Sequence, residues 1–109
     1  MKDSRIFLTH ILESAEMIQM YIQGITRKQF LASSEKRDAV VRRFEIIGEA
    51  TKHLTDEIRN HDMSIPWKKI AGMRDILIHE YFAIDMEFVW KTAKVDLPTF
   101  IKRVKKLLK

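Results

Sequence analysis

Apolar residues in the first quarter of the chain recur mostly at steps of three and four, the spacing of one face of an α-helix. They are Ile6, Leu8, Ile11, Leu12, Ala15, Ile18, Ile22 and Ile25. This stripe predicts an amphipathic helix from about Asp3 to Gln23. Gly24 follows where a left-handed C-cap residue is expected, because glycine adopts positive φ at little steric cost. We expect a short turn of helix over Thr26–Leu31.

A second apolar stripe predicts a helix from about Glu35 to Ile58, with Ser33 and Ser34 as candidate N-cap residues. The stripe consists of Val40, Val41, Phe44, Ile47, Thr51, Leu54 and Ile58. Gly48 lies in the middle of this helix, where glycine costs about 1 kcal/mol relative to alanine. A glycine at such a position indicates that the backbone of another helix approaches closely.

Proline and aspartate mark the starts of the remaining helices. The segment Ser64–Pro66 predicts an N-cap followed by a proline in the first turn, so a third helix begins near Pro66 or Trp67. Its apolar positions are Ile70, Met73, Leu77 and Ile78. Asp85 is the expected N-cap of a fourth helix. The segment Asp96–Pro98 is a second pattern of a cap followed by a proline, so we expect this helix to kink or restart there.

Composition supports a folded helical domain. Hydrophobic residues make up 46% and charged residues 32% of the chain, which excludes disorder as its main state. Glycine and proline number only 3 and 2, too few for the turns of a β-sandwich or small barrel. No window alternates with a period of two for long enough to predict a strand. We therefore predict one all-α domain over residues 1–109, an up-and-down bundle of four to five helices.

The sequence also limits chemistry and location. It has no cysteine, which excludes disulfide scaffolds, thiolate zinc sites and cysteine nucleophiles. No stretch approaches the roughly 20 apolar residues of a membrane span, and the N-terminus lacks the uninterrupted apolar core of a signal peptide. We expect a cytoplasmic protein with no membrane association.

The net charge is +5 with neutral histidines, which suits nucleic acid, anionic membranes or acidic proteins as partners. Basic side chains are densest in the tail Ile101–Lys109, where they alternate with apolar ones at helical spacing. This tail is either the solvated basic face of an amphipathic helix or a surface that contacts phosphates.

The residues that carry candidate chemistry are Arg74, Asp75, His79 and Tyr81, which lie within eight positions. Histidine moves a proton near neutral pH and arginine pairs with a phosphate through two hydrogen bonds, so these residue types suit phosphodiester chemistry. Arg74 and His79 are five positions apart, about 140° around an ideal helix. They flank one face only if the helix ends or bends near His79. The same set is also typical of a surface salt-bridge network.

Three motifs in the sequence resemble those of a known family. They are Ile47-Gly48-Glu49-Ala50, then Ile65-Pro66-Trp67, and then Gly72-Met73-Arg74 continuing to His79-Glu80-Tyr81, an R-x-x-x-x-H-x-Y signature. In order and spacing the chain resembles the HepT-like branch of HEPN-domain proteins, the toxin half of HEPN/MNT toxin–antitoxin pairs. The resemblance covers nearly the whole chain. Members commonly carry asparagine or another polar residue after the motif arginine, where this chain has Asp75.

The resemblance implies a HEPN-like helical bundle that cleaves RNA as a metal-independent endoribonuclease, without a cofactor. It also implies a homodimer in which the motif helices of two protomers meet in one composite cleft. His79 would assist attack of a ribose 2′-hydroxyl on the adjacent phosphate, and Arg74 would hold that phosphate. Asp75 would orient Arg74. Glu49 reaches the cleft or holds Arg74, or it is an ordinary solvated helix glutamate.

A protein partner is implied as well. In a type II or type VII toxin–antitoxin pair, an MNT-type nucleotidyltransferase antitoxin would transfer AMP to the Tyr81 hydroxyl, and the added charge and bulk would repel RNA. Two alternatives stay open. The chain could instead be a non-catalytic helical subunit that presents substrate to a nucleotidyltransferase, or a basic nucleic-acid-binding bundle that uses its tail.

The remaining aromatic and histidine residues are assigned ordinary structural roles. Trp67 and Trp90 stand at helical spacing with apolar neighbours, so we expect them in the core rather than stacked on bases. His10, His53 and His61 have polar neighbours and are expected on the surface. The sequence has no H-E-x-x-H motif and no carboxylates clustered at metal-ligand spacing, so no metal site is predicted.

Overall fold

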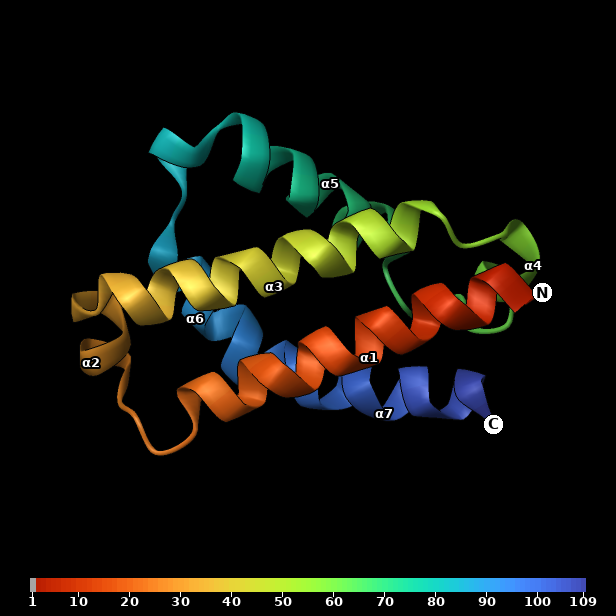
Figure 1. Cartoon of the computed structure of the whole chain (residues 1–109), viewed down its shortest axis with the longest axis horizontal. Helices are drawn as coiled ribbons and strands as arrows, with labels where there is room; N and C mark the ends of the chain where they lie inside the picture. Colours follow the sequence, from red (N-terminus) through yellow and green to blue (C-terminus); the bar gives the residue numbers. More distant parts are fainter. Residues whose placement is uncertain (1) are drawn as a thin grey trace.

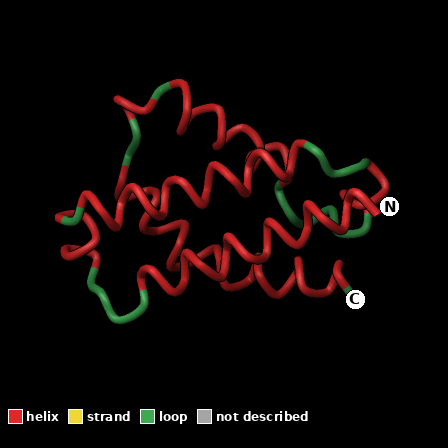
Figure 2. Tube along the Cα trace, viewed as in Figure 1, coloured by secondary structure: helices red, strands yellow, loops and turns green. Residues whose placement is uncertain are grey.

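The computed structural model describes residues 2–109, with side chains from Ser4 onward, and this part of the chain consists of helices joined by loops, without a strand (Figure 2). In chain order the elements are α1 (Lys2–Ile22), α2 (Arg27–Ala32), α3 (Ser34–Lys52), α4 (Asp56–Asn60), α5 (Trp67–His79), the 3₁₀ turn η1 (Tyr81–Ala83), α6 (Met86–Lys91), the π-helical segment η2 (Thr92–Asp96) and α7 (Leu97–Leu108). The predicted all-α class is confirmed. The longer runs α1, α3, α5 and α6–η2–α7 form the bundle, and α2 and α4 are short additions to it.

The central helix of the bundle is α3. Helix α1 runs beside it in the opposite direction, α5 packs on its other side, and α7 lies along α1 (Figure 1). Between the helices lie fully buried apolar side chains, among them Leu8, Ile11, Ile18, Phe30, Val40, Val89 and Val104. Because α3 contacts both α1 and α5, the surface over α3 is the place where side chains from all three helices meet.

Several predicted helix ends are confirmed. Gly24, two positions after the last residue of α1, has φ +76°, as expected for a left-handed C-cap glycine. The Ser33 hydroxyl accepts a hydrogen bond from the Lys36 amide at 3.1 Å and caps α3. The Asp85 carboxylate accepts hydrogen bonds from two first-turn amides of α6, at 3.0 and 3.2 Å. These caps are local interactions within three residues, which is why the sequence alone reveals them.

The second predicted helix is too long. It ends at Lys52, and the Thr55 hydroxyl then accepts a hydrogen bond from the Ile58 amide and starts the separate helix α4. Leu54, in the loop between α3 and α4, and Ile58, in α4, continue the apolar stripe, and both are buried. The apolar periodicity therefore continues across a break in the helix. The Thr55 N-cap starts a new helix there, although the apolar pattern alone predicts one continuous helix.

Two other predicted caps are wrong in detail. Ser64 does not cap α5: its backbone amide and its hydroxyl both donate to the Asp62 carboxylate, and Pro66 occupies the N-cap position. Asp96 makes no side-chain capping bond. The predicted irregularity at Asp96–Pro98 is nevertheless present, because the helix passes through the π-helical η2 before α7 begins with a proline in its first turn.

The tryptophans are structural, as predicted. Trp67 is buried, and its indole N–H lies 3.1 Å from the Arg59 carbonyl oxygen and 3.2 Å from that of Asp62. Trp90 is half-buried against Phe30, with 5.2 Å between ring centroids.

Among the described residues, no helix combines the length and the apolar character that a membrane span requires.

Candidate active site

Arg74 lies where α5 packs tightly against α3. A Cβ built on Gly48 of α3 would overlap the Cβ of Arg74 and lie 3.0 Å from the Ile70 carbonyl oxygen. The predicted close approach at Gly48 is confirmed, and the approaching backbone is that of the helix with the R-x-x-x-x-H motif. The absent side chain at Gly48 therefore determines how closely Arg74 sits over α3.

Two carboxylates hold the Arg74 guanidinium. Its Nε lies 3.1 Å from Glu49 Oε1, and its NH1 lies 3.0 Å from Asp75 Oδ1. Lys52 donates to the same Asp75 oxygen at 2.7 Å. Glu49 Oε2 lies 3.2 Å from His53 Nε2. The arginine side chain is only 25% exposed, so this network fixes its orientation while part of the guanidinium still reaches solvent.

The same network keeps Asp75 ionised. Hydrogen bonds from Lys52 and then from Arg74 lower the pKa of the Asp75 carboxyl below its usual value of 3.8. The Asp75 carboxylate thus lies between two cations, Lys52 and Arg74, and Arg74 is bound on its other side by Glu49. Lys52 was not among the predicted site residues. The signal that could have found it is its position one helical turn after Glu49, on the same part of α3.

His79 and Tyr81 lie at the far end of α5. His79 is the last residue of the helix and is exposed, and the backbone leaves the helical conformation at Glu80. Tyr81 begins η1 with 74% of its surface exposed, and its ring meets that of Phe82 edge to face at 5.8 Å between centroids. The structure thus joins Arg74 with Glu49 and Asp75 but does not bring His79 or Tyr81 into that network.

A groove of about 240 Å³ lies beside Arg74 and is called here the α1–α3–α5 groove. Its lining comes from all three helices and consists of Phe7, His10, Arg42, Glu45, Ile46, Glu49, Ala50, His53, Arg74 and Ile78. The rings of Phe7 and His53 stack within it, with centroids 4.7 Å apart and planes at 16°. The predicted surface positions of His10, His53 and His61 are confirmed, but two of these histidines line the groove.

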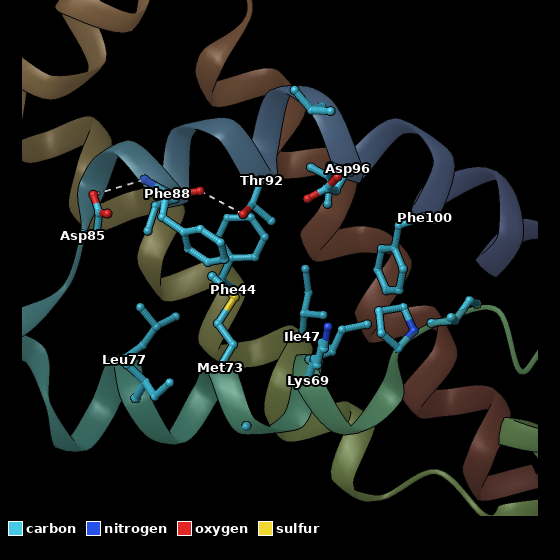
Figure 3. Close-up of a pocket in the computed structure, with 18 of the residues that line it drawn as sticks. Phe44, Ile47, Lys69, Met73, Leu77, Asp85, Phe88, Thr92, Asp96 and Phe100 are labelled. Carbon is cyan, nitrogen blue, oxygen red and sulfur yellow. Dashed lines mark hydrogen bonds between the residues drawn. The ribbon is translucent and has the colours of Figure 1, made fainter.

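A larger hollow of about 920 Å³ is bordered by α3, α5, α6, η2 and α7. Figure 3 shows Met73 and Leu77 of α5 on one wall and Phe88 and Phe100 on the opposite wall, with Phe44 and Ile47 of α3 between them. Its lining also includes the charged residues Lys69, Asp85, Asp96 and Arg103. The Thr92 hydroxyl is already used in a hydrogen bond to the Phe88 carbonyl oxygen at 2.8 Å. This hollow contains neither Arg74 nor His79, the two residues of the predicted nuclease motif. The site of interest is therefore the smaller groove.

Arg74 and His79 both lie within the part of the chain that matches a known family. The sequence model of the HepT-like ribonucleases matches residues 11–107. The chain belongs to the HepT-like ribonuclease family. The predicted family is confirmed, and with it the predicted enzyme class, a ribonuclease.

Curated relatives support this membership over nearly the whole chain. A Methanocaldococcus jannaschii protein whose name joins a gamma-glutamylcyclotransferase to a candidate RNase is 46% identical over 98% of the chain; the chain spans 48% of that protein. A Caldanaerobacter subterraneus protein named as a candidate RNase is 43% identical over 99% of the chain and 96% of its own length. A Thermococcus cleftensis protein named a probable ribonuclease HepT is 39% identical over 94% of both chains. No solved structure gives a significant match.

Proposed function

We propose that this HepT-like protein is a metal-independent endoribonuclease of the cytoplasm that works as a homodimer. The observation that carries the proposal is the preformed network in which Glu49 and Asp75 orient Arg74, on the helix that ends at His79. The two ion pairs use Nε and NH1 of the guanidinium. Arginine has five N–H donors, so donors on NH2 remain for a substrate phosphate.

The chemistry proposed for His79 is proton transfer. It accepts the proton of a ribose 2′-hydroxyl while the 2′-oxygen forms a bond to the adjacent phosphorus. The bond from phosphorus to the 5′-oxygen then breaks, and that oxygen takes a proton from a second histidine or from water. The products carry a 2′,3′-cyclic phosphate and a 5′-hydroxyl. Arg74 stabilises the charge that develops on the phosphate oxygens. The nucleophile belongs to the RNA, so the reaction requires no metal or cofactor.

A second copy of the chain would complete the site, because Arg74 and His79 are separated within one copy. Arg74 faces α3, and His79 lies about 140° further around α5, so the two side chains of one chain point in different directions. Two copies about a two-fold axis provide two arginines and two histidines for one cleft. The end of α5 offers an exposed apolar surface for such a contact, since Ile76 is 52% and Phe82 79% exposed.

We also propose that a nucleotidyltransferase antitoxin controls this enzyme through Tyr81, as in a type II or type VII pair. The exposed hydroxyl would attack the α-phosphorus of ATP and lose its proton, while the bond between the α- and β-phosphates breaks and pyrophosphate leaves. The AMP group would add negative charge and bulk two positions from His79. RNA would then be repelled from the cleft.

The test of the proposed reaction uses one oligonucleotide in three forms, incubated with the purified protein in excess chelator. We expect cleavage of the RNA, none of the DNA, and protection of an RNA that carries a single 2′-deoxyribose at the cleaved position. Cleavage of that singly substituted RNA at the same bond would contradict the mechanism. If the protein binds RNA without cleaving it, the alternative of a non-catalytic subunit is supported instead.

A further inference from the structure

The α1–α3–α5 groove has the composition of a nucleobase site. A planar base needs apolar surfaces against its faces and polar groups at its edge. The groove offers the apolar surfaces of Ile46 and Ile78 and the face of the Phe7 ring that His53 does not cover. It also offers the carboxylates of Glu45 and Glu49. Its volume of about 240 Å³ lies below the roughly 300 Å³ at which pockets for drug-sized molecules begin, so it suits one base rather than a base pair.

The groove is continuous with the proposed phosphate site because Arg74 forms part of its wall. Its floor is one face of α3, where Arg42, Glu45, Glu49 and His53 follow one another at steps of three and four. The Glu45 and Glu49 carboxylates on this floor repel phosphates, although the adjacent Arg42 weakens that repulsion. A nucleotide held by Arg74 can place its uncharged base there.

Glu45 is the group available to recognise the base edge. Glu49 is already engaged by Arg74 and His53. Glu45 has one ion pair, in which its Oε1 lies 3.4 Å from Arg42 NH1, and its side chain is only 18% exposed. A half-buried carboxylate accepts hydrogen bonds and cannot donate them, so it favours a base edge rich in N–H donors.

We propose that the α1–α3–α5 groove binds one base of the RNA next to the phosphate at Arg74, and that Glu45 selects guanine there. Guanine presents N1–H and the 2-amino group side by side, matching the two oxygens of one carboxylate. The Arg42 guanidinium, beside Glu45, can donate to the guanine O6. Uracil offers a single N–H between two carbonyl oxygens, which the carboxylate would repel. The inference rests on the proposed ribonuclease function for its activity readout, but not for its binding readout.

The experiment compares two short RNAs that differ only by guanine or uracil at one position beside the cleaved bond. A good bidentate contact to a base is worth ~1–3 kcal/mol, so we expect the guanine RNA to be cleaved about tenfold faster or more. Glu45→Gln keeps the shape but adds a donor, and it should remove most of this difference. Glu57→Gln, on the exposed face of α4, is the matched control and should keep it.

Binding of the same two RNAs to His79→Ala protein, followed by fluorescence anisotropy, gives a second readout that needs no cleavage. We expect tighter binding of the guanine RNA, and loss of the difference when Glu45→Gln is added. Equal binding of both RNAs, or a difference that survives Glu45→Gln, would overturn the base site. Failure of the parent protein to cleave any RNA, with the binding difference intact, would instead count against the proposed ribonuclease function.

Discussion

The Cβ of Arg74 lies so close to the backbone of Gly48 that no side chain fits between them. Two motifs separated by more than twenty positions in sequence therefore form one structural unit. Glu49, the residue after this glycine, binds the guanidinium of Arg74, the same residue whose Cβ packs against the glycine. The glycine sets the distance between α3 and α5, and the glutamate sets the direction of the arginine.

The first prediction compares two helical glycines. Gly48→Ala should lower the free energy of unfolding by about 1–3 kcal/mol, because the added methyl group overlaps Arg74 and forces the helices apart. Gly72→Ala is the matched control: a Cβ there meets nothing within 4 Å, so this change should be neutral or stabilise by up to about 1 kcal/mol. Urea denaturation measures both. Equal responses would show that the contact at Gly48 is not tight in solution.

The second prediction concerns acid pH and Asp75. Because the pKa of Asp75 is lowered in the folded protein, its ionised form favours folding above the usual value of 3.8, and this contribution is lost as the pH falls through the lower folded value. The wild type should therefore be more stable than Asp75→Asn at neutral pH. The two should converge below pH 3.8. A stability difference that stays constant from pH 6 to acid conditions would contradict the network around this carboxylate.

A third prediction tests assembly. Phe82, near the end of α5, and Met63, in the loop before it, are both 79% exposed. If the end of α5 forms the dimer contact, Phe82→Asp should weaken the dimer by introducing a charge into an apolar interface, whereas Met63→Asp should leave it intact. Light scattering at micromolar concentration distinguishes the two outcomes. A monomeric parent protein would argue against a composite cleft.

The fourth prediction concerns Tyr81. Tyr81→Phe keeps the ring but removes the acceptor hydroxyl, so the variant should cleave RNA at nearly the parent rate and escape neutralisation by its nucleotidyltransferase partner. Tyr21→Phe, on α1, serves as the control and should still be neutralised. Mass spectrometry of the co-expressed pair should find AMP on the peptide that contains Tyr81. Complete neutralisation without this modification would mean that the partner inhibits by binding alone.

Local signals in the sequence predicted the parts of the fold that depend on neighbouring residues. Gly24, Ser33 and Asp85 act within a turn of their own position, and each was identified correctly. The break between α3 and α4 was missed because Leu54, within it, and Ile58, after it, are both buried and maintain the apolar pattern.

The side-chain contacts between different helices could not be predicted from the sequence. Lys52 meets Asp75 across 23 positions, and nothing in the spacing of charges along one helix indicates a partner on another. The stacking of Phe7 on His53 joins the start of α1 to the end of α3 for the same reason. The motif identified the helix that carries Arg74, but the groove beside it emerges only when α1, α3 and α5 are packed together.

The most direct test of the central claim is cleavage of RNA by purified protein in the presence of chelator, compared among the parent, Arg74→Ala, His79→Ala and the surface control His61→Ala. General acid–base catalysis contributes about 10²–10⁴-fold to a rate, so His79→Ala should lose at least about a hundredfold in rate, and Arg74→Ala a comparable amount through lost phosphate binding. His61→Ala should match the parent, and circular dichroism should show all four proteins folded. Folded Arg74→Ala and His79→Ala proteins that cleave as fast as the parent would contradict the assignment of this site.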